Sequence, residues 1–403
     1  MPSLFTRLNT ITEAWNSLRR RLKVDVGVEE VPVEEAVGRV LAEDVVAPID
    51  LPPFDSSAVD GYAVRASDTF GATRNSPRLI KAEEVARVVT GGPVPEGFDA
   101  VVPVESAELK GRYLEVYSPV PRWGNLNRRG FDVAKGQRVL RRGRRVRPWD
   151  ISLLLTMGVE RVKVFRRLKA AIYPVGDELA EPPAPLTASR RPESNSFMIA
   201  SLLKSKGVKV CTRRILRDEV DGIAEALAEG LRRADIVVTL GGTSVGKKDL
   251  TVRAAGRLGE VIAHGISMRP GKPTALAVAS GKPIFCLSGY PVAALVGYKV
   301  FVEPAVDRML GLSSTPKPVR GRLALRVPSE PGVTDFVRAS IHLEGGEPVI
   351  KPLRRGGSSL YSSLISSEGV IIIPYELEGF EEGSHVPFLF HEDPWYPVLG
   401  LKP

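Results

Sequence analysis

Between residues 168 and 312, short apolar runs alternate with amphipathic segments, and this alternation limits the folds that the chain can adopt. Apolar runs at 168–175, 235–240 and 282–287, and the mixed run at 208–216, read as strands. Residues 196–206, and a segment with Val220, Ile223, Leu227 and Leu231 on one face, read as helices between them. Because strands that alternate with helices favour a parallel sheet covered on both faces, we predict a doubly wound α/β domain over residues 168–312.

The rest of the chain differs in texture from this domain. Residues 1–48 and 134–167 predict a helical linker domain, with helices over 4–22 and 31–45 and another that begins at Pro148. Residues 49–133 are rich in Gly and Pro and contain short alternating runs, which is typical of a small β-rich domain. Residues 313–403 contain apolar runs separated by Gly- and Ser-rich turns, so we expect a second all-β unit there.

The composition is that of a globular protein and not of a disordered or membrane-spanning one. Apolar residues make up 43% and charged residues 26% of the 403 residues, close to the average for globular domains. The most apolar stretch, 284–298, is shorter than the roughly twenty residues that span a bilayer. The N-terminal segment mixes acidic, basic and polar groups, unlike a signal sequence, so we expect a cytoplasmic protein without a membrane partner. A single glutamine, Gln137, and abundant arginine indicate a heat-adapted source.

Charge and the scarcity of soft ligands limit the chemistry. Cys211 and Cys286 are the only cysteines, and the four histidines fall in no metal-binding spacing, so a catalytic metal would be held by oxygen, as Mg²⁺ is. The net charge is +9, and the densest basic run is 141–147. This run fits a solvated face, an anionic small substrate or a nucleic acid. Nucleic acid is the least favoured, because no aromatic residues interleave with the basic ones.

The predicted strand at 235–240 runs into the glycine-rich loop GGTSVGKKDLT, residues 241–251. Glycines allow close approach of the backbone, and the free amides of such a loop can hold an anion. Gly241, Gly246 and Lys247 match a P-loop, but Lys248 stands where that motif needs Ser or Thr. A P-loop, an ordinary glycine turn and a different anion-binding loop all stay open. Asp249 is a candidate metal ligand in each case.

Two other predicted strands also run into polar loops. The first strand leads into GDEL, which places Asp177 and Glu178 side by side, and the last leads into SGYPVAAL, where Pro291 suits a first helical turn. The ordinary alternatives are a helix-start preference for acids and a plain strand-to-helix turn. Because ligands of open parallel sheets bind beyond the carboxyl ends of the strands, we predict the site at these loops.

Three more segments contribute candidate side chains. MRPGKP (268–273) presents Arg269 and Lys272 on a proline-stiffened loop that could grip a phosphate or an oxyanion, with a rigid connector as the alternative. Asp60 in DLPPFDSSAVDGYAVR and Asp132 in RRGFDVAKG lie in turns, where acids often only bond their own backbone. Carboxylates from a separate β domain, added to the crevice, would suit magnesium-assisted chemistry on a phosphorylated anion.

With these motifs assembled, the chain resembles the molybdopterin molybdenumtransferase family, which includes the C-terminal domain of gephyrin. DLPPFDSSAVDGYAVR, TGGPVPEGFDAVVPVE, VGDEL, GGTSVGKKD, MRPGKP and SGYP occur in the family's order, and the similarity covers about residues 22–382. The resemblance implies a homodimer with a helical linker domain, a β-rich domain, an α/β domain of molybdopterin-binding type and a C-terminal β-barrel. It also implies that the enzyme cleaves adenylylated molybdopterin with Mg²⁺ and inserts molybdate. Tungstate would fit equally well.

Functional residues follow from the resemblance position by position. The implied catalytic acids are Asp60, Asp132, Glu178, Asp218 and Asp249, of which Asp249 and Glu178 would hold the metal. The implied substrate-binding residues are Thr90, Gly241, Gly242, Ser244, Gly246, Arg269, Pro270, Lys272, Pro273, Ser288, Gly289 and Pro291. The molybdopterin adenylyltransferase is a further candidate partner.

The sequence departs from the family pattern at several of these motifs. Ser288 and Tyr290 stand where the family has Pro and Asn, and Phe131, Asn127 and Val175 replace Glu, Arg and a hydroxyl residue. Tyr290 matters most, because its ring fills space and replaces an amide that donates and accepts hydrogen bonds. Two other functions stay open: a non-catalytic pterin-binding or scaffold paralogue, and a P-loop-like nucleotide-binding protein.

Overall fold

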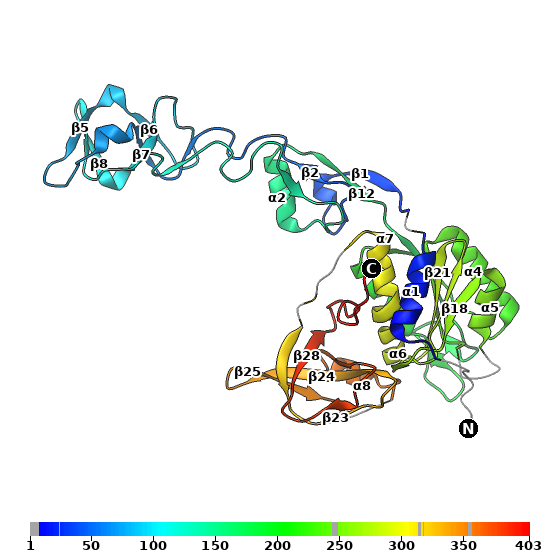
Figure 1. Cartoon of the computed structure of the whole chain (residues 1–403). Helices are drawn as coiled ribbons and strands as arrows, with labels where there is room; N and C mark the ends of the chain where they lie inside the picture. The colour runs from blue at the N-terminus through cyan, green and yellow to red at the C-terminus, as the bar shows by residue number, and fades with distance from the viewer. Residues whose placement is uncertain (1–7, 24, 244–248, 313–315, 317, 354–356) are drawn as a thin grey trace. The chain divides into compact units, whose positions relative to one another are not determined.

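The computed structural model describes residues 8–23, 25–243, 249–312, 316, 318–353 and 357–403. The chain divides into two compact units, one with residues up to 29 and from 165 onwards and one with residues 30–164. Figure 1 colours both by residue number. Within the described residues, no helix is long and apolar enough to cross a membrane.

A six-stranded sheet forms the centre of the α/β part. In spatial order its strands are β16 (Lys209–Arg213), β13 (Lys169–Pro174), β17 (Ile236–Leu240), β21 (Lys282–Leu287), β20 (Ala275–Ala279) and β18 (Glu260–His264). The first four are parallel, which confirms the predicted strands, whereas β20 is antiparallel to β21 and β18 is antiparallel to β20. β17 is buried along its whole length, as expected of a strand covered on both faces.

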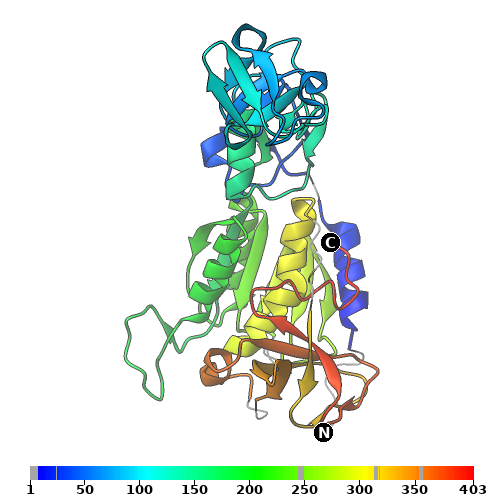
Figure 2. The same ribbon diagram turned by 90° about the vertical axis from the view of Figure 1, so that its left-hand side faces the viewer.

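Helices cover both faces of this sheet (Figure 2). They are α1 (Ile11–Arg21), α3 (Asn195–Ser205), α4 (Val220–Arg233), α5 (Leu250–Leu258), α6 (Pro291–Gly297) and α7 (Glu303–Met309), with a π-helical turn at Tyr298–Val302 between the last two. α4 buries Ile223, Leu227 and Gly230, which are three or four positions apart and therefore lie on one face. The doubly wound prediction is confirmed, and Thr10 and Glu13 form a capping box that begins α1.

The C-terminal region contains a closed β-barrel, which confirms the fold implied by the resemblance. Its strands are β24 (Thr334–Glu344), β25 (Glu347–Pro352), β22 (Val319–Leu323), β28 (His385–Phe390) and β26 (Gly369–Ile373), and β26 pairs back with β24. Two short strands, β23 (Val327–Pro328) and β27 (Gly379–Phe380), form a separate pair, and α8 (Tyr361–Ile365) follows β25. β19 (Met268–Arg269) pairs with the start of β24, so the loop of residues 268–273 is tied to the barrel.

The tail, residues 391–403, packs against the α/β part. Trp395 and Tyr396 are fully buried, and the Tyr396 hydroxyl donates a hydrogen bond to Asp307 on α7 at 2.8 Å. At the far end of the tail, the carbonyl oxygen of Lys402 accepts a hydrogen bond from the indole of Trp15 on α1 at 3.0 Å. The tail therefore joins the barrel to the first and last helices of the α/β part.

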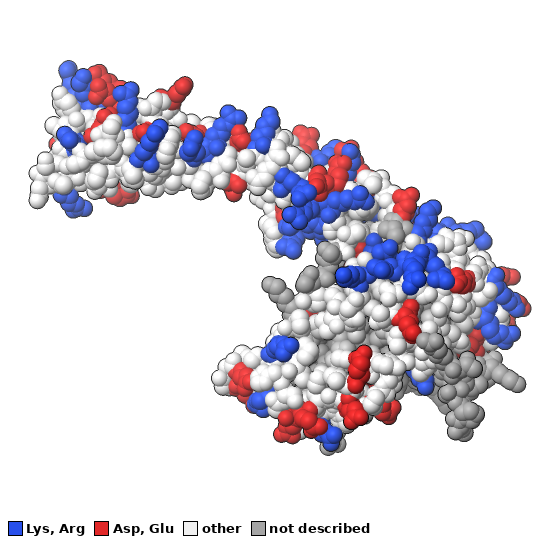
Figure 3. All heavy atoms as spheres, in the orientation of Figure 1, with Lys and Arg blue, Asp and Glu red and all other residues white. Residues whose placement is uncertain are grey.

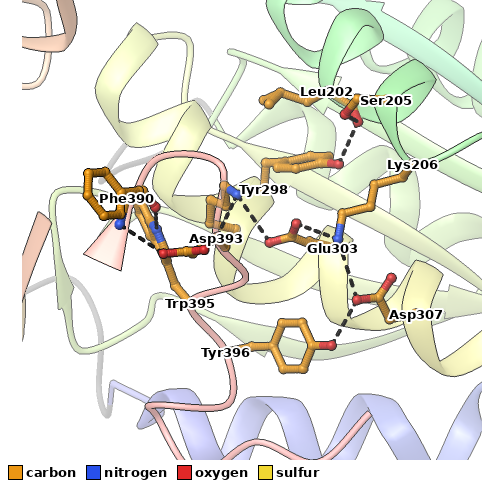
Figure 4. A network of polar contacts seen from close by, with 11 residues as sticks. Leu202, Ser205, Lys206, Tyr298, Glu303, Asp307, Phe390, Asp393, Trp395 and Tyr396 are labelled. Atoms are coloured by element: carbon orange, nitrogen blue, oxygen red, sulfur yellow. Dashed lines mark hydrogen bonds and ion pairs between the residues drawn. The ribbon is translucent and has the colours of Figure 1, made fainter. Parts of the chain in front are cut away.

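A network of buried charges lies where the tail meets α7 (Figure 4). Glu303 is 1% exposed and accepts Lys206 Nζ at 2.7 Å, and Lys299 Nζ lies 3.5 Å from the same carboxylate. Lys299 also donates to the backbone carbonyl of Asp393 in the tail at 2.9 Å. Because isolated buried charges are costly, this mutual pairing is what allows the charges to remain inside.

The unit of residues 30–164 is mainly β-structure, as predicted for 49–133. Its strands include two three-stranded sheets, β6 (Ala86–Val88) with β4 (Gly61–Val64) and β7 (Ala100–Pro103), and β5 (Arg78–Lys81) with β9 (Tyr113–Val116) and β8 (Ala107–Lys110). Short pairs are β3 (Ser56–Ser57) with β10 (Leu126–Asn127), and β2 (Val45–Val46) with β11 (Arg138–Leu140). β1 (Val28–Pro32) pairs with β12 (Arg161–Phe165), and α2 (Pro148–Thr156) begins at the predicted proline.

The helix predicted over residues 31–45 is wrong. The structure has the end of β1, a 3₁₀ turn at Val33–Glu35 and then β2 in that range. Val31 and Val33 alternate into the core, whereas Pro32 cannot donate within a helix and Gly38 adopts φ +77°. Strand alternation and turn geometry therefore outweigh the helical spacing of the apolar residues.

The basic run at 141–147 is partly neutralised within its own unit. Arg144 forms a bidentate pair with the buried Asp150, at 2.8 and 3.1 Å. Arg138 and the backbone amide of Arg142 both bond Asp44. Figure 3 shows Lys and Arg in several groups along the visible face, with Asp and Glu between many of them.

Candidate active site

The loops that follow three parallel strands line one cavity of about 990 Å³, called here the crevice. β13 contributes residues 175–179, β17 contributes 240–243 and β21 contributes 288–291. In the sheet, β16 and β17 lie on opposite sides of β13, so the chain reverses its direction of winding beside the crevice. Ligands of doubly wound folds bind at such a switch point, and the structure thus brings together the strand-end loops predicted from the sequence.

Glycines let these three loops pack closely. Gly241 and Gly242 adopt φ +88° and +66°, and a Cβ atom on Gly241 would lie 2.6 Å from the carbonyl oxygen of Val175. A Cβ atom on Gly289 would lie 3.3 Å from Cα of Gly241. Glycine is therefore required where these loops pack together, and the Gly241 amide there donates to the carbonyl oxygen of Leu287 at 3.0 Å. Ser244 and Gly246, together with Lys247 and Lys248 of the P-loop alternative, fall outside the described residues.

Carboxylates surround the same space. Asp177, Glu178 and Asp218 line the crevice, and the backbone amide of Asp218 donates to Asp177 Oδ1 at 3.3 Å. Asp249 does not line the crevice, although its neighbour Leu250 does; it is the N-cap residue of α5, with Oδ2 at 3.2 Å from Nε2 of His264 on β18. Among the described residues, no three Asp, Glu, His or Cys side chains form a ready-made metal site. Cys286 is no candidate nucleophile, because burial raises the pKa of its thiol to about 11.

A second cavity of about 540 Å³ lies between the α/β part and the barrel. The predicted Arg269, Pro270, Lys272 and Pro273 line it, and Ser288 and Tyr290 line both cavities. Arg269 is already held by the barrel, because its guanidinium lies 2.5 Å from the buried Asp335. That bond raises the pKa of Arg269 above its usual value. A ligand that binds Arg269 would therefore share the guanidinium with Asp335.

The other predicted residues belong to the unit of residues 30–164. The backbone amide and hydroxyl of Thr90 donate to Asp60 Oδ1 at 2.6 and 2.8 Å, which lowers the pKa of Asp60. Asp132 is exposed, as is Phe131, and Asn127 ends β10. Asp60 and Thr90 thus lie together, whereas the crevice acids belong to the other unit.

Two residues that line the crevice were not predicted from the sequence. Asn195 stands at the start of α3, and Tyr361 comes from α8 of the barrel region. Their side chains meet, with Tyr361 Oη donating to Asn195 Oδ1 at 3.3 Å. A polar residue at a helix start looks ordinary in a sequence, and Tyr361 is 166 positions away from its partner.

The fold and the cavities define an α/β protein with a ligand crevice beyond the carboxyl ends of its strands, lined on one side by residues from the β-barrel region. Three family descriptions match successive parts of the chain. Residues 9–158 match the "MoeA N-terminal region (domain I and II)", residues 171–308 match the "Probable molybdopterin binding domain" and residues 320–390 match the "MoeA C-terminal region (domain IV)".

Whole-chain comparisons agree with these matches. The molybdopterin molybdenumtransferase of Haemophilus influenzae is 30% identical over 97% of this chain and 100% of its own. The molybdopterin molybdenumtransferase 2 of Mycobacterium tuberculosis is 33% identical over 88% and 93%. The crystal structure of the molybdopterin biosynthesis MoeA protein from Pyrococcus horikoshii superposes with a TM-score of 0.83 at 30% identity, over 95% of this chain and 100% of that one. The chain belongs to the molybdopterin molybdenumtransferase family.

Proposed function

We propose that this protein is a molybdopterin molybdenumtransferase, an enzyme that cleaves adenylylated molybdopterin and inserts molybdate or tungstate into its dithiolene. The crevice is the observation that carries this proposal. It places the acids Glu178 and Asp218 beside the glycine backbone of Gly241 and Gly242, so it offers acid–base groups together with a close approach to the main chain. Membership of an enzyme family whose relatives bear this name supports the same reaction.

We assign a different role in the reaction to each group of crevice residues, according to its chemistry. The amides of Gly242 and Gly289, two glycines that line the crevice, would receive phosphate oxygens, whereas the Gly241 amide donates to the carbonyl oxygen of Leu287. The carboxylates of Glu178 and Asp218 orient a water molecule and accept its proton during attack on the phosphoanhydride. No protein nucleophile is required, so the phosphoanhydride is hydrolysed directly. The second cavity, with Lys272, receives the oxyanion.

The donor set of the crevice fits Mg²⁺. Its side chains offer carboxylate and hydroxyl oxygens, and Mg²⁺ is usually held by one or two carboxylates together with substrate phosphates. Glu178 lines the crevice and Asp249 directly precedes the lining residue Leu250, so these two carboxylates would hold the ion, and His264 would keep the Asp249 carboxylate in place. When bound, Mg²⁺ would polarise the phosphoanhydride and neutralise charge that develops on it.

The proposal also covers the oligomeric state, the compartment and the partner of the protein. We propose that the protein acts as a homodimer in the cytoplasm of a heat-adapted organism, receives its substrate from a molybdopterin adenylyltransferase, and uses Asp60, Thr90 and Asp132 together with the crevice acids. If each site draws on both copies, a mixture of the inactive Asp60→Ala and Glu178→Ala variants should regain about a quarter of wild-type activity after subunit exchange. No recovery despite exchange would contradict the shared site.

The test of function is AMP release from adenylylated molybdopterin with Mg²⁺, measured separately with molybdate and tungstate. We expect release that depends on the oxyanion, and a fall of at least about a hundredfold for Glu178→Gln and for Asp249→Ala. The matched control is Glu376→Gln, which changes an exposed acid of the barrel region that lines neither cavity.

Two outcomes would favour the other functions. Pterin binding without turnover, under conditions where a relative is active, would indicate a scaffold paralogue. A thermal shift caused by ATP or GTP alone, lost in Lys247→Ala, would indicate a nucleotide-binding protein instead.

A further inference from the structure

We infer that Tyr361, contributed by the barrel region, is a positioning residue for the ligand loop of the crevice, defined here as residues 288–291. The ring of Tyr361 is half exposed and lines the crevice, although its helix, α8, follows a barrel strand. A side chain from another domain that reaches a strand-end cavity has no role in the α/β core itself. It therefore acts on the crevice or on its ligand.

The Tyr361 hydroxyl sits at the start of α3. It donates to Asn195 Oδ1 at 3.3 Å and lies 2.8 Å from the hydroxyl oxygen of Ser194. Asn195 is 9% exposed, so its amide has little access to water and depends on protein partners. Tyr361 satisfies the acceptor end of that amide.

The NH₂ group of the same amide is hydrogen-bonded to the ligand loop. Asn195 Nδ2 donates to the carbonyl oxygen of Gly289 at 2.6 Å. Because an amide has one orientation that matches a donor on one side and an acceptor on the other, Tyr361 fixes how Asn195 addresses Gly289. The chain of contacts thus runs from the barrel region to α3 and then to the ligand loop.

A second contact fastens the barrel region to the same place. The backbone amide of Val292, at the start of α6, donates to the carbonyl oxygen of Ser358 at 3.1 Å. Ser358 and Ser359 precede α8 and line the second cavity and the crevice, respectively. The barrel region therefore holds the ligand loop at two places. It bonds Val292, the residue that follows the loop, and through Asn195 it also holds Gly289 inside the loop.

The consequence concerns the backbone conformation of Gly289. This glycine approaches Gly241 closely, so a shift of the ligand loop would alter the crevice-lining backbone of both loops. Glycine resists such a shift poorly by itself, because it has the widest conformational range of any residue. Tyr361 supplies the restraint that the loop sequence lacks.

Hydrogen exchange tests this role without any substrate. In Tyr361→Phe, which keeps the ring and removes only the hydroxyl, we expect amides of the peptide 286–292 to exchange about fivefold faster than in wild type. Asn195→Ala should give the same or a larger effect, and the double variant should match Asn195→Ala alone. Tyr375→Phe, on a tyrosine that lines neither cavity, is the matched control and should leave the peptide unchanged.

The kinetic arm of the test rests on the proposed function. For Tyr361→Phe we expect kcat of AMP release to fall about tenfold with KM for the pterin substrate nearly constant, and the melting temperature to stay within about 2 °C. Wild-type exchange and wild-type kcat in Tyr361→Phe would overturn the inference. If the wild-type protein releases no AMP, the proposed function fails, and the exchange experiment still decides whether Tyr361 positions the loop.

Discussion

At the scale of single residues, Gly241 meets two separate constraints. Its φ of +88° is costly for any side chain, and an added Cβ would lie 2.6 Å from a carbonyl oxygen. We therefore expect Gly241→Ala to lower the free energy of unfolding by about 2 kcal/mol or more. Gly222 on α4 is the matched control, because a Cβ there meets nothing within 4 Å, and Gly222→Ala should stabilise the helix by about 0.5–1 kcal/mol. Denaturant unfolding of both variants checks the difference, and equal effects would show that the loop relaxes.

Among the residues that depart from the family pattern, Tyr290 has a position in the structure that suggests a role. Its ring is 51% exposed and forms part of the wall of both cavities. An aromatic ring left open at a cavity is suited to contact a planar ligand. We expect Tyr290→Ala to raise KM for the pterin substrate about three- to tenfold through loss of that contact, with little change in melting temperature. Steady-state kinetics beside Tyr375→Ala checks this, and an unchanged KM would exclude Tyr290 from substrate binding.

Much of the candidate site could be predicted because it depends on strand ends. Glu178, Gly241 and Ser288 each follow a predicted strand, and parallel topology forces such positions to one edge of the sheet. Asn195 and Tyr361 could not be found in this way. Their importance arises from a contact between two domains, and local sequence pattern carries no information on such contacts.

At the scale of elements, prediction succeeded where local pattern and packing agree. The helix predicted at 196–206 is α3, Asn195–Ser205, and the strand at 235–240 is β17. It failed at 31–45, where helical spacing of apolar residues competes with Pro32 and Gly38. The antiparallel strands β18 and β20 were also not predicted, because short runs such as Ala275–Ala279 have weak strand propensity and gain stability only from the sheet.

The contact between the barrel and the tail should depend on pH. Burial lowers the pKa of His391 below its usual 6.5 and Lys299 lowers it further, although Glu392 and Glu368 act in the opposite direction. A group with a depressed native pKa contributes stability above its unfolded pKa and loses it as pH falls through the native value. We therefore expect the free energy of unfolding to decrease as pH falls below about 6.5.

The matched variant for this prediction is His391→Gln, which replaces the imidazole near Ser367 by an amide that hydrogen-bonds but does not titrate. We expect a flatter stability profile than wild type between about pH 7.5 and 5, measured by denaturant unfolding at each pH. Profiles of equal slope would show that His391 does not set the pH dependence.

At the scale of the whole molecule, each unit has hydrophobic cores of its own. In residues 30–164, one core contains Val33, Leu41 and Leu154 and another contains Val64, Leu114 and Val116. We expect a fragment of residues 30–164 to fold alone, with a cooperative thermal transition followed by circular dichroism. A fragment that melts without cooperativity would show that this unit needs the rest of the chain.

The other unit is made from two separated stretches of sequence, and this has a consequence for protein synthesis. α1 buries Trp15 and Leu18, and it packs beside β18 and β20, more than two hundred residues further on. At about 5–20 residues per second, the ribosome needs on the order of ten to fifty seconds to make that partner. During this interval the nascent apolar face of α1 is exposed. The hydrogen bond from Trp15 to Lys402 can form only after the C-terminal residues have been made. The intervening unit of residues 30–164 can fold first, so chaperones would be needed chiefly for the helix that is translated earliest.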